Sequence, residues 1–328
     1  MVSAMDMDTV RNEVLAGATE RIARAALREL LTSVDTLWRE AAAGDLADTE
    51  AVHQLRVSTR RSGAALDVFA HFLPARASRR LERKLAKLRR RAGRARDYDV
   101  LAGRYARLPG IVPPGLIELL DMRRAQARSA IRALHEHWQQ EGILERAAGE
   151  LVRAVRPRRT EARRAASRGG SIPFHRFAPR RLRKIAQRFY SAGDTDPRRL
   201  EDMHPLRIRA KQLRYGLDLL RAGLAAERFD KVYALVKKLT QRLGEVNDDL
   251  AAAGIAAELL AKQDAIGNST ELREWLEQRV AAERGAAADR FEAFRHWWTP
   301  RRQRRLRRRL KKLARHDAPV QSNGGDAS

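Results

Sequence analysis

Two short runs of basic side chains, each led by a histidine, have the residue types and spacing that suit anion chemistry. His53, Arg56 and Arg60 stand at positions i, i+3 and i+7, so on an α-helix they share one face. A second run with the same spacing consists of His204, Arg207, Lys211 and Arg214. Guanidinium groups bind phosphate in a bidentate way, and each charge-assisted hydrogen bond is worth roughly 1.5 to 3 kcal/mol. The pattern therefore indicates a site for a phosphate-bearing anion.

The segment after each run adds further cations at helical spacing. These are Lys87, Arg91 and Arg94 in the first case, and Lys238 and Arg242 in the second. Like charges three or four residues apart destabilise an isolated helix by a few tenths of a kcal/mol per pair, so we expect a bound anion to compensate them. We predict that both runs and these later cations bind one polyanion.

Catalytic and metal-binding chemistry are poorly provided for. Both histidines lie among cations with no carboxylate in the motif, so we interpret them as hydrogen-bond donors to phosphate and not as general bases or phosphoryl acceptors. The chain has no Cys and no matched acidic set, which argues against a metal site. Nucleotide-binding, hydrolase and zinc-protease motifs are missing. We expect a binding protein with no catalytic residues, cofactor or metal. Four acidic residues, Asp97, Asp99, Asp248 and Asp249, are interpreted as structural partners of arginine.

An internal repeat relates the two runs. Sliding the chain against itself by 151 positions aligns them without a gap over fifty residues. Apolar positions repeat as well, because Leu55, Leu66, Leu206 and Leu217 belong to stripes that step +4, +3, +4, +3 in both copies. Each stripe is typical of one buried helix face. We predict a duplicated unit.

The fold class expected is all-α, since the chain has only 20 Gly and 11 Pro and its apolar residues recur at helical spacing. Helices are predicted over residues 10–43, 50–73, 77–107, 114–140, 178–192, 200–222, 227–262 and 270–298. We expect two four-helix bundles related by a pseudo-two-fold axis. The expected divisions are a flexible N-terminus (1–9), a first bundle (10–155), a basic linker (156–177), a second bundle (178–299) and a basic, then disordered, tail (300–328).

Charge is concentrated in the repeated segments of this chain of net charge +26. Residues 51–110 hold 16 basic and 4 acidic side chains, and residues 198–242 hold 12 and 5. Residues 301–315 hold ten Arg or Lys and no acid, and we consider both a solubilising extension and an accessory anion-binding arm. No secretory signal or membrane span is readable, so we expect a cytoplasmic protein.

The two runs also carry a family resemblance. HQLRVSTRR from His53 and HPLRIRAKQLRY from His204 resemble the paired signature of CHAD domains, the conserved histidine α-helical domain family. RDYD from Arg96 and NDD from Asn247 resemble the second element of each half, and the likeness spans roughly residues 10–300. The resemblance implies a basic central surface that binds inorganic polyphosphate, often with targeting to polyphosphate granules. It carries over to His53, Arg56, Arg60, His204, Arg207, Lys211 and Arg214.

The sequence departs from the family pattern in two respects. Ser62 and Gly63 stand where the family usually has Leu and Arg, so weaker binding is expected from the first half. Many relatives also carry a triphosphate-hydrolase domain of the CYTH type, which we expect this chain to lack.

A nucleic-acid-binding protein is the main alternative, because any strongly basic surface holds DNA or RNA at low salt. Only 5% of the residues are aromatic, which provides poorly for base stacking. The sequence favours polyphosphate as the partner and leaves low-specificity nucleic-acid binding open.

Overall fold

The computed structural model describes residues 18–109, 112–113, 115–156, 171–191, 197–262 and 269–315. Within these ranges the chain forms helices and no β-strand, apart from an isolated bridge between Ala18 and Pro173. The predicted all-α class is therefore confirmed. The expected N-terminus 1–9, most of the linker 156–177 and the end of the tail lie outside the described residues.

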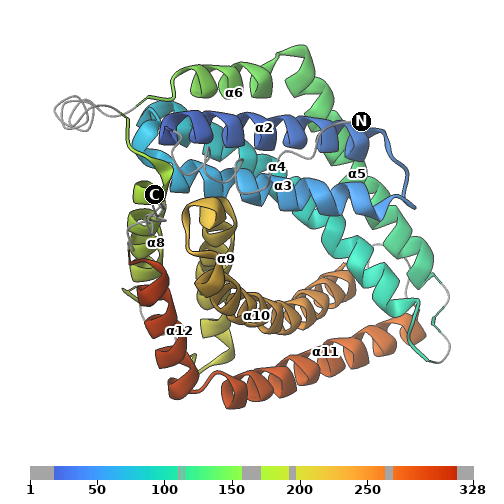
Figure 1. Ribbon diagram of the computed structural model, residues 1–328. Helices are drawn as coiled ribbons and strands as arrows, with labels where there is room; N and C mark the ends of the chain where they lie inside the picture. Colours follow the sequence, from blue (N-terminus) through green and yellow to red (C-terminus); the bar gives the residue numbers. More distant parts are fainter. Residues whose placement is uncertain are drawn as a thin grey trace, which may run out of the picture.

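The first group consists of α2 to α6, in which each helix packs on the next along the chain and α6 also lies beside α2 (Figure 1). Helix α2 contacts α3, α5 and α6, while α4 contacts α3, α5 and α6. The bounds are α2 Thr19–Ala43, α3 Thr49–Val68, α4 Ala75–Tyr105, α5 Leu116–Gln140 and α6 Ile143–Arg153. A short 3₁₀ turn, Ala70–Phe72, joins α3 to α4.

The second group is built around the long helix α10, which contacts α9, α11 and α12. Helix α8 packs on α9 and α12. The bounds are α8 Phe174–Ser191, α9 Met203–Leu220, α10 Ala226–Ala261, α11 Thr270–Trp297 and α12 Pro300–Leu313. Short 3₁₀ turns flank α9 on either side, over Leu200–Asp202 and Arg221–Gly223.

Side-chain caps fix several helix starts. The carboxylate of Asp48 accepts from the backbone N–H of Ala51 at the start of α3, and the Ser269 hydroxyl accepts from Leu272 at the start of α11. Such caps satisfy a backbone donor that has no partner inside the helix. These two starts agree with the sequence prediction.

Two of the helices in the described ranges lie outside the predicted set. Helix α6 follows α5 after Gly142, whose φ of 53° lies in the left-handed region that glycine adopts readily. Helix α12 falls in the segment that the sequence analysis treated as a tail. Its leucines, Leu306, Leu310 and Leu313, are buried against the second group, so the segment is part of the fold.

The two groups meet where α3 packs on α9 and α4 packs on α10. The predicted stripes lie inside, because Leu55 and Thr59 on α3 and Leu206 and Ala210 on α9 are all fully buried. In Figure 1, α9 and α10 lie below α3 and α4, and α11 and α12 run around their outer side. Among the helices described, none is long and apolar enough to cross a membrane.

Candidate functional site

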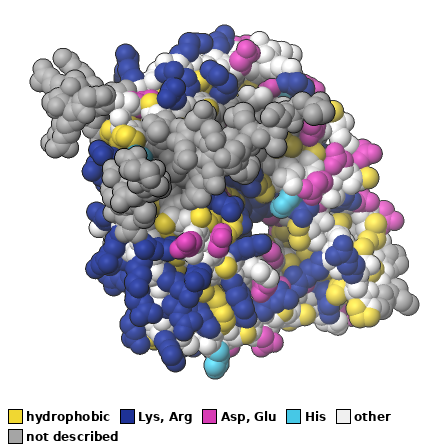
Figure 2. Space-filling view, viewed as in Figure 1, with side chains coloured by type: hydrophobic (Ala, Val, Ile, Leu, Met, Phe, Trp, Pro, Cys, Tyr) yellow, Lys and Arg dark blue, Asp and Glu magenta, His cyan; other side chains and the backbone are white. Residues whose placement is uncertain are grey.

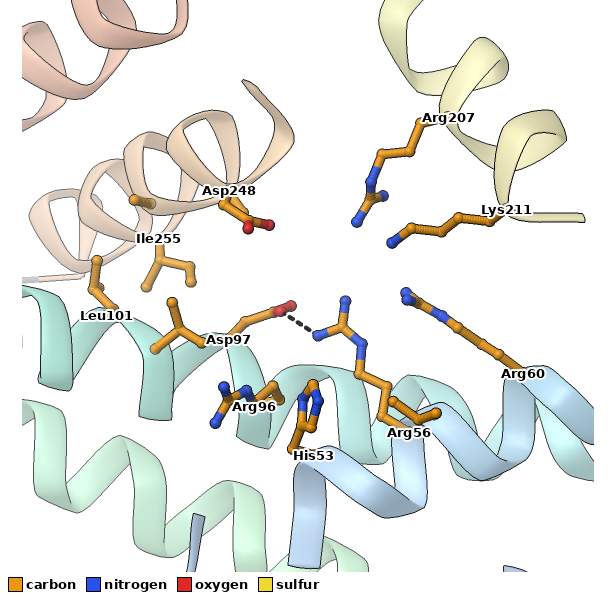
Figure 3. A pocket seen from close by; sticks show the side chains of 14 residues that line it. His53, Arg56, Arg60, Arg96, Asp97, Leu101, Arg207, Lys211, Asp248 and Ile255 are labelled. Carbon is orange, nitrogen blue, oxygen red and sulfur yellow. Dashed lines mark hydrogen bonds and ion pairs between the residues drawn. The ribbon is translucent and has the colours of Figure 1, made fainter. Parts of the chain in front are cut away.

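A cavity of about 210 Å³ opens where α3 and α4 face α9 and α10. Its cationic lining comes from helices of both groups, and Figure 3 shows Arg56 and Arg60 on α3 directed toward Arg207 and Lys211 on α9. The full set of cationic and histidine side chains in the lining is His53, Arg56, Arg60, Arg96, Arg207 and Lys211. Both predicted runs therefore contribute to one site.

A second cavity, of about 450 Å³, adjoins the first. Arg60, Arg207 and Lys211 line both cavities, so these three side chains, called the shared cations below, stand between them. The second cavity adds Arg89, Arg188 and His204. An extended anion that contacts the shared cations can therefore occupy space on either side of them.

Helix packing aims these side chains at one another. Leu55 and Thr59 face the interior of the first group, which turns the following residues, Arg56 and Arg60, toward α9. On α9 the burial of Leu206 and Ala210 does the same for the residues next to them, Arg207 and Lys211.

Of Arg56 and the three shared cations, only Arg56 has a carboxylate partner among the described residues. Arg56 donates from Nη1 to Oδ1 of Asp97 at 2.8 Å. Among the described residues, the shared cations form no ion pair, although Asp248 also lines the cavity. Arg207 is only 7% exposed, and its Nε has no hydrogen-bond partner. The shared cations are thus partly removed from water without a carboxylate directly paired to them in the part of the chain that the structure describes.

Burial of the shared cations beside one another lowers the pKa of each of them. Burial, reinforced by Arg207, Arg60 and Arg56, lowers the pKa of Lys211 to about 7, while Asp248 acts in the opposite direction. Burial and the neighbouring Arg56 lower the pKa of Arg60 to about 10, which leaves it charged at neutral pH. The pKa of Arg207 is lowered too, mainly by burial. A bound anion would relieve both the desolvation and the repulsion.

His53 sits at the edge of the cation cluster. Burial lowers its pKa below 6.5, and the charge of Arg96 adds to that effect. The ring is therefore mostly neutral at pH 7, and a neutral imidazole still donates one hydrogen bond. His204 is exposed and lines the second cavity, so the two histidines do not occupy the same environment.

Comparison with known proteins identifies the family. The sequence model of the CHAD domain matches residues 21–257. The chain belongs to the CHAD family. No CYTH domain is evident in the region that the match covers.

The chain is similar in sequence to two other proteins and in fold to two solved structures. Two uncharacterized proteins from Mycobacterium tuberculosis strains are 30% identical over 225 residues, which is 66% of this chain and 41% of theirs, so the chain spans well under half of their length. The crystal structure of the CHAD domain from the plant Ricinus communis has a TM-score of 0.57 at 21% identity, covering 84% of this chain and 93% of that one. PptA from Streptomyces chartreusis has a TM-score of 0.58 at 17% identity, covering 86% and 99%.

The three cations predicted on α4, Lys87, Arg91 and Arg94, do not line either cavity. Lys87 is exposed, with its Nζ 5.7 Å from the centre of the Trp138 ring on α5. Arg91 is exposed as well. Arg94 pairs with Glu258 on α10 and donates to the Tyr98 hydroxyl at 2.9 Å.

The predicted cations on α10, and the last one on α9, also lie elsewhere. Lys238 is exposed, and Arg242 lies 5.1 Å from the ring centre of Trp297 on α11. Arg214 lies 4.9 Å from the ring centre of Tyr215. What α10 contributes to the first cavity is Asp248 and an apolar wall that includes Ile255.

Three arginines outside the predicted set of anion-binding residues lie near the shared cations, although Arg96 begins the RDYD element noted in the sequence. Arg96 lines the first cavity, while Arg89 and Arg188 line the second. Arg89 and Arg96 are seven residues apart on α4, so their helical spacing was a usable signal. Nη1 of Arg89 lies 3.7 Å from the point where a Cβ on Gly63 would stand. A guanidinium from α4 therefore reaches the space beside Gly63.

The aspartates predicted to hold arginine mostly do so. Asp99 pairs with Arg124 and Arg128, and Asp249 pairs with Arg104 and Arg290, in both cases with the carboxylate buried. Asp97 holds Arg56, as described above. Asp248 differs, because its carboxylate lines the first cavity and forms no ion pair among the residues described.

Proposed function

We propose that this protein binds inorganic polyphosphate at the two adjoining cavities, with Arg56 and the shared cations as the central contacts. The observation that carries the proposal is that the shared cations, three basic side chains from α3 and α9, lie together and form no ion pair with any residue that the structure describes. A polyanion supplies the missing counter-charge, and phosphate oxygens match guanidinium in a bidentate way.

The shape of the site favours a thin, linear anion. The shared cations stand between two cavities, so a linear polyphosphate can contact them from both sides. A nucleic-acid duplex is too wide to enter a cavity of about 210 Å³. Apart from histidine, the only aromatic side chain in either lining is Tyr215. Base stacking on aromatic side chains, on which single-stranded nucleic acid binding depends, is therefore poorly supported.

The deciding experiment is a competition at physiological ionic strength. Protein loaded with labelled long-chain polyphosphate is challenged with unlabelled polyphosphate, duplex DNA or RNA at equal phosphate concentration. We expect polyphosphate to displace the label and both nucleic acids to compete weakly. Preferential displacement by DNA or RNA would contradict the proposal.

A pair of double variants locates the binding. Arg207→Gln with Lys211→Gln is expected to weaken polyphosphate binding by at least about a hundredfold, because two charge-assisted contacts are lost, and to lower its salt dependence. The matched control is Arg91→Gln with Lys238→Gln, which removes the same charge from exposed positions outside both cavities. Equal losses in both variants would mean that net charge alone governs binding.

Binding without catalysis is part of the proposal. The carboxylates that reach the first cavity are Asp97, held by Arg56, and Asp248. Among the described residues, no group of three or more His, Asp and Glu is arranged to hold a metal ion. Incubation of the protein with polyphosphate is expected to release no orthophosphate, with or without added divalent metal, and measurable release would refute this part.

We further propose that the protein works in the cytoplasm at polyphosphate granules. The support is its cation cluster together with the targeting that the CHAD family implies. A fluorescent fusion is expected to co-localise with granules in polyphosphate-producing cells. The fusion carrying Arg207→Gln and Lys211→Gln is expected to spread evenly, and granule binding by that variant would contradict the proposal.

A further inference from the structure

The helices α8 and α12 form an adjoining pair that contains no acidic residue. Helix α12 carries nine Arg or Lys among its 14 residues, so it presents a dense row of positive charge about 21 Å long. It lies beyond residue 257, where the CHAD family match ends. Its charge is therefore not explained by the cavities of the matched region.

Helix α12 is held firmly in place. Leu306, Leu310 and Leu313 are buried against the second helix group. Arg309 donates to the backbone carbonyl of Lys231 on α10 at 3.2 Å. The Arg307 guanidinium lies 5.5 Å from the ring centre of Tyr190 on α8. The helix thus has a fixed orientation, with one face committed to the protein interior.

The remaining faces of α12 present cations to solvent. Within the described part of the chain, these exposed side chains form no ion pair: Arg301, Arg304, Arg305, Arg308, Lys311 and Lys312. Figure 2 shows Lys and Arg side chains gathered over the part of this face where α8 and α12 lie in Figure 1. A surface of this kind is complementary to a polyanion.

Helix α8 connects this surface to the cavities. Arg180, Lys184 and Arg188 are exposed at steps of four residues along it, and Arg188, which pairs with Asp67 on α3 at 2.7 Å, lines the second cavity beside the shared cations. Arg183 donates to the backbone carbonyl of Ala314 just after α12, at 3.2 Å. Basic side chains therefore continue from the second cavity along α8 to α12.

We propose that the outer faces of α8 and α12, called the α8–α12 face, bind the part of a long polyphosphate chain that extends beyond the cavities. This inference rests on the proposed function and adds a second contact surface, and with it a preference for long chains. Linked contacts to one chain act through a high local concentration, so binding at the cavities favours binding on the face.

Other anionic partners fit this surface less well. An amphipathic helix inserts into a membrane through its apolar face, but the leucines of α12 are already buried in the protein. The exposed side chains of α12 are Arg and Lys, with no exposed aromatic residue for base stacking. Continuity with the cavities through Arg188 favours the ligand that occupies them.

The test compares tripolyphosphate with long-chain polyphosphate on three forms of the whole chain. The test variant is Arg301→Gln, Arg304→Gln and Arg308→Gln, which leaves the buried leucines intact. The matched control removes the same charge from exposed arginines of α11, by Arg273→Gln, Arg284→Gln and Arg295→Gln. A second test variant, Arg180→Gln with Lys184→Gln, reports on α8 independently of how α12 folds.

We expect both test variants to bind long-chain polyphosphate more weakly than the control, on the order of tenfold to a hundredfold for the triple variant, and to bind tripolyphosphate as the wild type does. Unchanged long-chain affinity would overturn the inference, as would an equal loss for tripolyphosphate. If the triple variant loses affinity for duplex DNA but not for long-chain polyphosphate, the face belongs to nucleic acid and the inference is wrong. Failure of the wild type to bind tripolyphosphate would refute the proposed cavity site instead.

Discussion

Charged side chains are partly removed from water both where α4, α10 and α11 pack and where α3 meets α9, but among the described residues the shared cations of the second region have no ion-pair partner. Asp249 is fully buried and accepts ion pairs at 2.8 Å from Arg104 and Arg290. Arg207 is buried and Lys211 is partly buried, yet neither forms an ion pair within the part of the chain that the structure describes. The paired charges of the first region join α4, α10 and α11, whereas the unpaired cations of the second are the ones that we propose to bind an anion.

The largest effect expected from this comparison is on stability. Asp249→Asn removes the ion pair of Arg290 and leaves Arg104 paired with Glu283 alone, so it should lower the free energy of unfolding by roughly 1.5 to 3 kcal/mol. Asp248→Asn, the neighbouring change at the cavity, should stay within about 1 kcal/mol, because that carboxylate holds no ion pair among the described residues. Denaturant unfolding measures both, and equal losses would erase the distinction between the two regions.

Lys211→Met should preserve or raise the stability of the protein while it weakens polyphosphate binding. It removes an unpaired, largely buried charge and keeps the apolar stem, so the free energy of unfolding without ligand should be unchanged or higher by about 1 kcal/mol. Polyphosphate affinity should fall on the order of tenfold or more. Calorimetric titration and unfolding of the same sample check both, and a strongly destabilised variant would show that Lys211 is a structural residue.

The pH dependence of binding tests the same charge. Because the pKa of Lys211 is lowered to about 7, a bound polyanion favours its protonated form, so affinity should rise as pH falls from about 8 to about 6. The stability of the ligand-free protein has the opposite dependence on pH. Between the folded-state pKa of about 7 and the ordinary value of 10.5, Lys211 binds more protons in the unfolded chain than in the folded one. The free energy of unfolding should therefore rise from about pH 7 toward 10.5. Lys211→Arg should flatten the binding profile at high affinity. A slope that persists in Lys211→Arg would assign it to another group.

The smallest expected effect belongs to His53. Its pKa is lowered by burial and by Arg96, so its contribution to affinity should appear only below pH 6.5. His53→Gln should remove that further rise and leave the profile above pH 6.5 unchanged. Loss of affinity at pH 8 in this variant would instead mean that the neutral ring is a necessary hydrogen-bond donor.

The fold was largely predictable because the sequence states its helices clearly. The buried stripe through Leu55 and Leu206 and the caps at Asp48 and Ser269 place α3, α9 and α11 within a few residues of their observed bounds. Helix α6 was missed although Leu144, Ala147 and Leu151 recur at helical spacing, because it follows α5 after a two-residue turn.

The site was only partly predictable. The spacing of His53, Arg56 and Arg60 located the face of α3 that carries the cluster. A stripe such as Leu85, Leu88 and Ala92 says which side of α4 is buried but not which flank meets the other helix group. The sequence therefore favoured Lys87 and Arg91 as anion-binding residues of α4, whereas the side chains that line the cavities are Arg89 and Arg96. That choice depends on how α4 and α9 are placed relative to each other, which is a property of the tertiary packing.

A crystal structure of the protein with bound polyphosphate tests the central claim most directly. We expect phosphate groups within hydrogen-bonding distance of Arg60, Arg207 and Lys211, with the chain continuing into the second cavity beside Arg188. Phosphate found only at sites remote from the shared cations, with those side chains still unpaired in the complex, would contradict the account.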